Sequence, residues 1–581
     1  MDACTPAYVI VIYLDGLRWD MLDVVARSQR GRICEYRSGD LMISTPYVMK
    51  VIEGKCDDPM YISVDGGKRI MHVMGETVPL DTKLMSPESS DVVSPVESFG
   101  NVSVVRLPFT GDEVFPEGTE VVVISNAFEL RKDARKIVKN IISIREKVGP
   151  NVILCAPGMA DASTLALYSN MGIDVFDDSV ARVAGSGGIL SVPEGEIISE
   201  GDMTDRNLKA MEEECSKIHD FIQGERLREL VDQRAPSSAS SVAVLRIFDD
   251  EGYAYQEEAC STVGCRFSCN TTQALRRPEV LRYRNMIMER YEKPEHKRVL
   301  VLLPCSAKKP YHISKTHRRF ASAIHNGEYD TLVHEVIVTS PLGAVPRELD
   351  VFFPPKSYDI PVTGQWKPEE KEFIRELVGH LIEQGYDTVI SHLGEDTELV
   401  SGLCEMKETV VGDPTSPASL KNLEDALREA TKGMEGIGDY RMDRKETIRS
   451  VLSFQFGKEL ADAILEGDTY GTGKFPYWKI IRGKDLQLGM LTEERGMFSM
   501  TLDGAKILAD HNYHVVKMMD FELKGSLFAV GVEDADPEIR IGDEAVIVCN
   551  GEVRAIGVAM MSGREMKELR RGVAVRIRHK L

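Results

Sequence analysis

The sequence predicts a multidomain α/β protein that ends in a small β unit. A chain of 581 residues is too long for one domain. Short apolar runs alternate with amphipathic stretches, as where residues 121–124 precede a helical pattern over 129–147. From residue 496 onward, short strands are separated by Gly-Asp, Asp-Pro and Asn-Gly turns. We therefore expect four units along the chain.

The order of these patterns gives the expected units. Alternating strands and helices over residues 1–290 predict a parallel sheet with outer helices. A second, central α/β unit over 291–430 begins with the buried-strand pattern at 298–303 and continues with a helix at 369–384 and a strand at 388–390. Residues 437–495 form a small α+β linker unit, and 496–581 form a β-barrel.

Composition and charge limit the possible classes of function. With 43% hydrophobic and 28% charged residues the chain can bury large cores, and its net charge of −21 excludes a uniformly basic coat for nucleic acid. Eleven isolated cysteines favour reduced thiols over a disulfide framework. The apolar run at 7–14 is too short to span a membrane and lacks a basic leader, so we expect no membrane segment and a cytoplasmic protein.

Two local segments are basic within this acidic chain. Residues 276–320 hold thirteen Lys and Arg against four Glu, and residues 564–580 hold seven against two acidic residues. Such clusters suit a polyanion because each neutralised phosphate releases counterions. For either cluster alone, a solvated basic surface is an equally good interpretation.

The most informative string is Leu-Pro-Cys-Ser-Ala-Lys-Lys-Pro-Tyr-His-Ile-Ser-Lys-Thr-His at residues 303–317. An apolar strand delivers Cys305 into a polar loop, where α/β sheets bind their ligands. We expect Lys308, Lys309 and His317 to lower the pKa of the thiol and so activate it as a nucleophile. An isolated Pro-Cys-Ser would more simply be a strand end, but the whole string favours a reactive site.

This string resembles the signature of the archaeosine synthase family, Pro-Cys-Ser-x-x-Lys-Pro-Tyr-x-x-Ser-x-Ser-His. Thr316 departs from it by standing where Ser is usual. The strings at 340–349 and 358–366 also resemble the core domain of that family. The candidate catalytic residues are Cys305, Ser306, Lys309, Tyr311, Ser314 and His317.

The resemblance implies a reaction on 7-cyano-7-deazaguanine at position 15 of tRNA. Lysine, or ammonia derived from glutamine, would add to the nitrile and form an amidine, which a radical SAM partner enzyme would then process. Cys305 could first form a thioimidate that the amine displaces. Alternatively the amine attacks directly after deprotonation by a group such as His317, while Lys309 or Tyr311 protonates the nitrile nitrogen. The sequence leaves both routes open.

The N-terminal region resembles tRNA-guanine transglycosylases, which implies a (β/α) barrel there. Residues 172–178 resemble the string that carries their nucleophilic Asp, which would be Asp177. No Asp-Ser-Gly-Gly-Phe-Gln string is present, and this string supplies the second catalytic Asp and the base-binding glycines. We therefore expect a degenerate barrel that does not exchange bases, with Asp177 as a candidate catalytic residue or a relic.

The same relatives hold a structural zinc, and this sequence offers Cys260, Cys265, Cys269 and His296 as ligands. The spacing is looser than theirs, so three unliganded thiols are an equal alternative.

The C-terminal barrel resembles a PUA domain, an RNA-binding module, at residues 502–505, 524–526, 536–543 and 555–559. We expect tRNA as partner, with contacts from Arg318, Arg319, Lys524, Arg564, Arg571, Arg576 and Arg578. The rival hypotheses are a zinc-dependent transglycosylase that inserts the cyano base and a non-catalytic tRNA-binding scaffold. The sequence leaves open whether the protein forms a homodimer.

Overall fold

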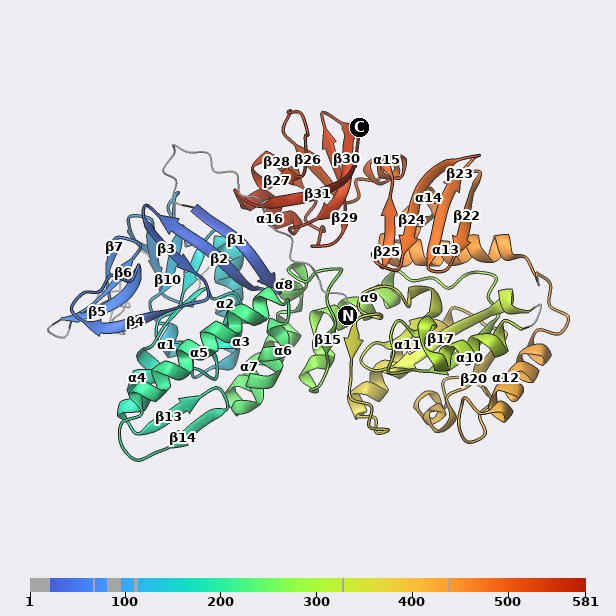
Figure 1. Ribbon diagram of the computed structural model, residues 1–581, viewed down its shortest axis with the longest axis horizontal. Helices are drawn as coiled ribbons and strands as arrows, with labels where there is room; N and C mark the ends of the chain where they lie inside the picture. The colour runs from blue at the N-terminus through green and yellow to red at the C-terminus, as the bar shows by residue number, and fades with distance from the viewer. Residues whose placement is uncertain (1–20, 66–67, 81–95, 109–112, 327–328, 437) are drawn as a thin grey trace.

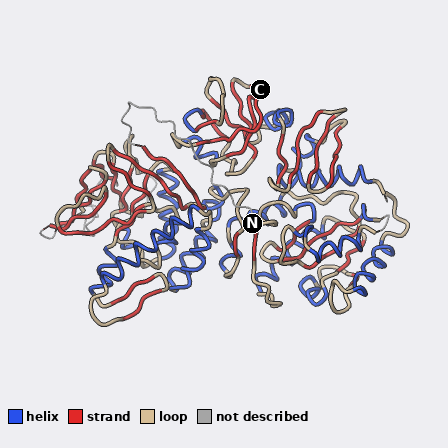
Figure 2. The backbone as a smooth tube through the Cα atoms, in the orientation of Figure 1, coloured by secondary structure: helices blue, strands red, loops and turns tan. Residues whose placement is uncertain are grey.

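The computed structural model describes residues 21–65, 68–80, 96–108, 113–326, 329–436 and 438–581. Four bodies are visible: an N-terminal α/β unit, a central α/β unit, a linker unit and a C-terminal β unit (Figure 1). The N-terminal and central units form the two ends of the molecule, and the C-terminal unit lies above the junction between them (Figure 2). The apolar run at 7–14 lies outside the described residues.

The N-terminal unit is built on a nine-stranded sheet. Its strands are β4 (Tyr47–Glu53), β5 (Met60–Asp65), β6 (Lys68–Val73), β7 (Glu76–Pro79), β8 (Val96–Phe99), β9 (Val102–Val105), β10 (Val121–Ile124), β11 (Ile153–Cys155) and β12 (Val175–Asp177). Their order is β7-β6-β5-β4-β12-β11-β10-β9-β8. Strands β5, β4, β12, β11, β10 and β9 are neighbours in this order and run parallel to one another. Strand β6 pairs antiparallel with β5 and with β7, and β8 pairs antiparallel with β9.

This sheet differs from the predicted (β/α) barrel. Among the described strands no pairing joins β7 to β8, and three of the pairings, β5 with β6, β6 with β7 and β8 with β9, are antiparallel. The physical reason is that β5, β6 and β7 are linked by short hairpin connections, which cannot carry the crossover helices that parallel strands need. The parallel middle of the sheet is the part that agrees with the prediction.

Helices cover one face of this sheet and a small second sheet covers the other. Val122 and Leu154 face the helices, whereas Val121, Val123 and Ile153 face β1 to β3. Both faces are therefore apolar, which is typical of buried parallel strands. The remaining elements are β1 (Met21–Ser28), β2 (Gly31–Ser38), β3 (Leu41–Ser44), β13 (Ile189–Val192), β14 (Gly195–Ile198), α1 (Ala127–Leu130), α2 (Ala134–Val148), α3 (Leu165–Asn170), α4 (Ser179–Ser186), α5 (Thr204–Gln223), α6 (Leu227–Arg234), α7 (Ala239–Glu251) and α8 (Tyr253–Glu258).

The central unit has a five-stranded sheet between two layers of helices. Its elements are β16 (Val299–Pro304), β17 (Val333–Thr339), β18 (Gly343–Pro346), β20 (Thr388–Ser391), β21 (Lys407–Glu408), α9 (Pro278–Glu289), α10 (Lys315–Ile324), α11 (Pro368–Glu383) and α12 (Pro417–Ala430), with the short pair β15 (Phe267–Ser268) and β19 (Tyr358–Asp359) beside it. The order is β18-β17-β16-β20-β21, so β16 is the middle strand.

Strand β16 is buried on both faces. Val299, Val301 and Leu303 pack with α10 and α12, whereas Leu300 and Leu302 pack with α9 and α11. This alternation follows from the two-residue period of a strand. The predicted strand at 298–303 and the predicted helix at 369–384 both agree with the structure within one residue.

Two smaller units complete the chain. The linker unit contains α13 (Tyr440–Phe456), α14 (Lys458–Ile464), β22 (Thr469–Lys474), β23 (Tyr477–Arg482), β24 (Leu486–Thr492) and β25 (Met497–Met500). The C-terminal unit contains α15 (Leu502–Asp510), β26 (Val515–Met518), β27 (Leu527–Phe528), β28 (Val532–Ala535), β29 (Glu544–Cys549), β30 (Glu552–Ala559), α16 (Gly563–Glu568) and β31 (Val573–Lys580). Its six strands form one sheet in the order β27-β31-β30-β29-β26-β28.

The C-terminal unit is fixed to the N-terminal one by specific contacts. Arg27 on β1 pairs with Glu565 on α16 at 2.9 Å, and Arg540 pairs with Glu257 on α8 at 2.8 Å. The backbone amide of Thr262 donates to the carbonyl of Ile541 at 2.8 Å. None of the helices in the described parts of the chain combines the length and the apolar run that a bilayer crossing requires.

A buried ion cluster holds the N-terminal unit together. Asp174, before β12, accepts hydrogen bonds from the Arg32 Nε atom and the Leu154 amide, each at 2.9 Å, and also pairs with Arg145. Burial would raise the pKa of Asp174, but Arg145 and Arg32 outweigh burial and keep that pKa below its ordinary value. The carboxylate is therefore ionised and links β2, α2 and β11.

Replacing this carboxylate should destabilise the N-terminal unit. We expect Asp174→Asn to lower the local free energy of unfolding by about 3 kcal/mol, because two buried guanidinium groups lose their anion. Native-state hydrogen exchange of the β10 to β12 amides measures this change. The control is Glu129→Gln, which removes an exposed partner of Arg106 and should cost less than about 1 kcal/mol. Equal protection of these amides from hydrogen exchange in both variants would contradict the stabilising role of the Asp174 carboxylate.

Candidate active site

The loop that follows β16 lies where the parallel strands of the central sheet end. β16 runs parallel to both β17 and β20, so the carboxyl ends of all three strands meet at one edge. Cys305 and Ser306 are partly exposed there, and Lys308 is fully exposed. The loop is thus at the surface, in the position that the sequence predicts for a reactive group.

The Cys305 thiol is protonated in the resting site. Burial raises the pKa of this thiol above its ordinary value, and the Thr339 hydroxyl and the Lys309 ammonium group lower it by less. Lys309, one of the three cations expected to activate the thiol, acts in the expected direction, but burial outweighs its effect. Burial also lowers the pKa of Lys309, against the opposing effect of the thiol. The two groups therefore approach each other in proton affinity, which favours proton transfer between them.

Three hydroxyl groups form a connected cluster beside Cys305. The Thr339 and Tyr358 hydroxyls lie 2.5 Å apart, and the Tyr311 hydroxyl donates to Thr339 Oγ1 at 3.3 Å. Tyr311 and Tyr358 also share a hydrogen bond. The Lys309 Nζ atom lies 4.0 Å from the centre of the Tyr358 ring, a cation–π contact that holds the ammonium group over the cluster. Both phenols are buried and their pKa values are raised, so they remain protonated.

A buried carboxylate fixes the shape of the loop. Asp350, fully buried after β18, accepts hydrogen bonds from the backbone amides of Tyr311 at 2.6 Å and His312 at 2.7 Å. The Nδ1 atom of His312 lies 2.9 Å from the same carboxylate. Two backbone donors and one ring donor on a single anion hold the loop in one conformation.

His317 is buried beneath the loop. Its Nδ1 atom accepts a hydrogen bond from Arg347 at 2.9 Å, and its side chain is buried in α10. Burial and the Arg347 charge lower its pKa to about 3. An imidazole with this pKa is neutral near neutral pH and binds a proton weakly. This environment disfavours the predicted roles of His317 as a general base and as a cation that activates the thiol.

Two predicted hydroxyl groups have structural contacts in the same segment. The Ser314 side chain caps α10 by accepting from the His317 amide at 3.1 Å. The Ser306 hydroxyl donates to the Lys308 carbonyl at 3.1 Å. Ser314 is buried, whereas Ser306 keeps some exposure next to the thiol.

Several site residues were missed by the sequence reasoning. Thr339 ends β17, Asp350 follows the short helix after β18, and Asp396 acts on the Cys305 thiol by raising its pKa. The Asp396 carboxylate accepts from the Trp366 ring nitrogen at 2.7 Å, which ties the segment after β19 to the site. A signal was present for two of them, because the string at 340–349 lies directly between Thr339 and Asp350.

Asp177 lies in another unit. It ends β12 in the middle of the N-terminal sheet and accepts from the Gly158 amide at 2.6 Å and the Ser179 hydroxyl at 3.1 Å. Burial raises its pKa to about 6. The structure does not bring it to the Cys305 site.

The predicted zinc ligands do not fit a metal site. Among the described residues no three His, Cys, Asp or Glu side chains come together in a way that could hold a metal ion. Cys260 and Cys269 are buried and donate to carbonyls, whereas Cys265 is exposed. The His296 Nε2 atom instead lies 2.9 Å from the Asp443 carboxylate.

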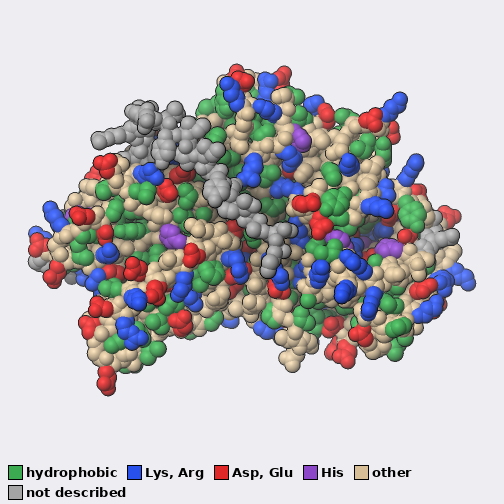
Figure 3. Space-filling model, in the orientation of Figure 1, with side chains coloured by type: hydrophobic (Ala, Val, Ile, Leu, Met, Phe, Trp, Pro, Cys, Tyr) green, Lys and Arg blue, Asp and Glu red, His purple; other side chains and the backbone are tan. Residues whose placement is uncertain are grey.

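The predicted RNA-contacting cations differ in their exposure and in their contacts within the protein. Arg318 and Arg319 are exposed on α10, where Lys and Arg side chains gather on the visible face (Figure 3). Lys524, Arg571 and Arg576 are also exposed. The remaining two, Arg564 and Arg578, bind within the protein: Arg564 donates to the Glu146 carbonyl at 2.6 Å, and Arg578 donates to Glu544 and to the Met500 carbonyl, each at 2.8 Å.

Two family models match the chain. One, described as a domain of unknown function (DUF5591), covers residues 280–427, and the PUA domain model covers 517–581. The first contains the whole Cys305 site, and the second contains most of the C-terminal sheet.

Curated relatives match most of the chain. The archaeosine synthase subunit alpha of Methanosarcina acetivorans is 33% identical, covering 85% of each chain, and the archaeosine synthase of Haloferax volcanii is 29% identical, covering 96% of this chain and 99% of its own. A tRNA-guanine(15) transglycosylase of Methanocaldococcus jannaschii is 25% identical over 65% of this chain and 52% of its own. Among solved structures, AF0587, a protein of unknown function, is 27% identical with a TM-score of 0.40, covering 52% of this chain and 99% of its own.

The protonation state of Cys305 can be tested by alkylation. At pH 7.5 we expect iodoacetamide to modify Cys305 more slowly than the thiol of a short cysteine peptide, because the raised pKa leaves less thiolate. The rate should rise with pH beyond the range in which the peptide levels off. Lys309→Gln should slow the reaction further, since the thiolate loses a neighbouring cation.

Mass spectrometry of the peptide that contains Cys305 separates this reaction from that of the exposed Cys265. Faster alkylation than in the free peptide would show that the thiol is activated in the resting site and would contradict this description.

Proposed function

The chain belongs to the archaeosine synthase family, and from this premise we propose the reaction that its Cys305 site performs. The protein is an enzyme of archaeosine biosynthesis in tRNA, as the similarity to the archaeosine synthases over most of the chain establishes. We propose that its substrate group is the nitrile of 7-cyano-7-deazaguanine at position 15 of tRNA. The amine donor is lysine, or ammonia derived from glutamine, and the product is an amidine.

The observation that carries the proposal is that the Cys305 thiol and the Lys309 ammonium group, which lies over the Tyr358 ring, are near enough for each to affect the pKa of the other. A nitrile reacts when its carbon meets a nucleophile while its nitrogen receives a proton. Here the sulfur would bond to the nitrile carbon, Lys309 would give a proton to the nitrile nitrogen, and the thiol proton would pass to Lys309. The product of this step is a thioimidate.

The second step releases the enzyme. The donor amine would attack the thioimidate carbon, the carbon–sulfur bond would break, and the thiol would regain a proton from the amine. Overall, one N–H bond adds across the nitrile, and no oxidant or reductant is consumed. The covalent route is favoured over direct attack because His317, a candidate base for direct attack, has a pKa of about 3.

The hydroxyl cluster suits the charge that develops on the nitrile nitrogen. Tyr311, Thr339 and Tyr358 are neutral, connected donors beside the thiol. Donors that are already oriented stabilise a developing negative charge without reorganisation. We propose that they position Lys309 and the nitrile nitrogen.

The transglycosylase alternative has weaker support. The match to the transglycosylase is less similar than the archaeosine synthase matches and covers about half of that protein. Asp177 also lacks the glycine-rich partner string, and the described strands around it do not form a closed parallel barrel. We propose that the N-terminal and C-terminal units hold tRNA and that a separate radical SAM enzyme acts on the adduct.

Labelled lysine tests the reaction. With tRNA that carries the cyano base, wild-type protein should transfer the label to RNA, and Cys305→Ser should reduce the rate by about 1000-fold or more. Cys404→Ser, a partly exposed cysteine of the same unit, is the matched control and should retain the rate. Full activity of Cys305→Ser would rule out the thioimidate. If the wild-type protein transferred label to RNA from neither lysine nor glutamine, a non-catalytic scaffold would be favoured.

A further inference from the structure

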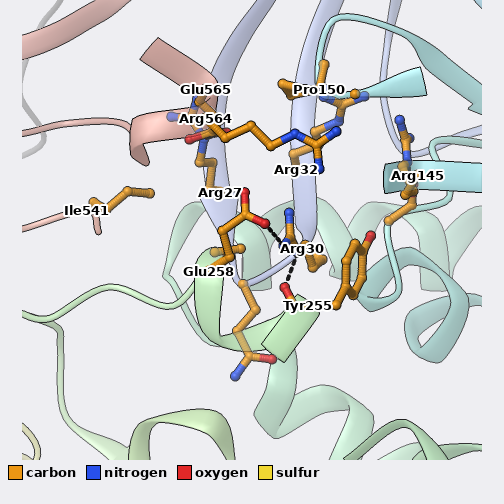
Figure 4. Close-up of a pocket in the computed structure, with 14 residues that line it drawn as sticks. Arg27, Arg30, Arg32, Arg145, Pro150, Tyr255, Glu258, Ile541, Arg564 and Glu565 are labelled. Atoms are coloured by element: carbon orange, nitrogen blue, oxygen red, sulfur yellow. Dashed lines mark hydrogen bonds and ion pairs between the residues drawn. The ribbon is translucent and has the colours of Figure 1, made fainter. Parts of the chain in front are cut away.

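We propose that a hollow lined by five arginines, between the N-terminal and C-terminal units, is an oxyanion site that takes a phosphate group. The arginines come from both units: β1, the β1–β2 turn, β2, α2 and α16 contribute Arg27, Arg30, Arg32, Arg145 and Arg564 (Figure 4). This site is separate from the Cys305 site, and phosphate binding there does not depend on the reaction proposed for Cys305.

The carboxylates around the hollow do not balance its positive charge. The five arginines pair with four carboxylates, which leaves one positive charge over. These acidic partners are Asp174, Glu258, Glu565 and Glu568. A guanidinium group has five N–H donors. Arg32 and Arg145 use theirs on Asp174 and on backbone carbonyls, so the donors left for a ligand are those of the other three arginines. The charge and the remaining donors both suit an anion.

One arginine nitrogen at the hollow has no hydrogen-bond acceptor among the described residues. Arg27 donates from its Nε atom to Glu565 at 2.9 Å, while its Nη2 atom is buried and has no hydrogen-bond partner in the described parts of the chain. A buried charged donor without an acceptor is costly. An oxygen of a bound phosphate would supply the acceptor.

The hollow is already shaped for a small ligand. Arg30 is held by the carbonyl of Tyr255 at 2.6 Å, by Glu258 at 3.0 Å and by the Tyr255 ring, whose centre lies 3.9 Å from the guanidinium carbon. Figure 4 shows Arg30 between Glu258 and Tyr255, with Arg564 approaching from α16. Ordering these side chains therefore costs little when a ligand binds.

The hollow has room for a group of the size of a phosphate. Its volume is about 50 Å³, room for roughly three to five water molecules. A tetrahedral oxyanion fits this space. Arg27, Arg30 and Arg564 keep between 17% and 26% of their side-chain surface exposed, so the phosphate can remain attached to a chain outside.

The phosphate that suits this position best belongs to an RNA backbone. A phosphodiester needs to insert only its two non-bridging oxygens into the hollow. A guanidinium group can bind both of these oxygens through two parallel hydrogen bonds. The other source of the same chemistry is free inorganic phosphate, and the experiment distinguishes the two.

Two variants break the same ion pair but change the charge in opposite directions. Arg27→Gln removes a donor, whereas Glu565→Gln removes the competing acceptor and keeps the polar contact of Glu565 with the Ser562 amide. We expect Arg27→Gln to weaken phosphate binding by about tenfold and Glu565→Gln to strengthen it. A purely structural ion pair would respond to both variants in the same direction.

The readouts are thermal stabilisation by inorganic phosphate, relative to chloride at equal ionic strength, and the Kd for tRNA. Arg131→Gln is the matched control, because Arg131 is similarly exposed, pairs with one acidic residue and lies outside the hollow. If the phosphate belongs to RNA, Arg27→Gln should also raise the Kd for tRNA about tenfold and reduce its salt slope by about one unit.

Opposite effects of the two variants on phosphate binding support the site whether or not tRNA binding follows. A change in tRNA affinity assigns the phosphate to RNA, and its absence assigns the site to free phosphate. The proposal is overturned if phosphate stabilises the wild type no more than chloride does, or if both variants weaken phosphate binding equally.

Discussion

The site depends on the position of β16. This strand is buried on both faces and runs parallel to both of its neighbours, so its carboxyl end must open at the edge where β17 and β20 also end. Side chains on the two faces bind the strand to separate helix layers. The Cys305 loop therefore starts from a rigid point, and the Asp350 carboxylate fixes the backbone that follows. Reactive groups on a rigid scaffold keep the geometry that covalent catalysis needs.

Much of the central unit could be predicted from the sequence because its signals are local. The apolar run before Pro304 and the helical period after residue 368 lie within single elements. Asp350 could not be assigned in this way, because it bonds to amides 38 and 39 residues earlier in the chain. The environment of His317 could not be read from the sequence either, since its pKa is lowered by burial and by the charge of Arg347, which lies 30 residues away. Burial and distant charge are properties of the fold.

The N-terminal unit illustrates the same limit at the level of topology. Alternating short strands predict a sheet, but hairpins and crossovers can share one pattern of apolar residues. The described strands include antiparallel pairs at both edges, so the sheet is mixed. The predicted zinc ligands show the same limit: Cys260, Cys265, Cys269 and His296 lie near each other in sequence, while the fold pairs His296 with Asp443, 147 residues away.

The covalent route requires the Cys305 sulfur to bond to the nitrile carbon of the modified base. The direct measurement is the mass of the Cys305 peptide after the protein has been mixed with cyano-modified tRNA without any amine donor and then digested with nuclease and protease. The account predicts a nucleotide adduct on Cys305 that disappears when the donor is added. An unmodified Cys305 peptide, in protein that forms product as soon as donor is supplied, would contradict it.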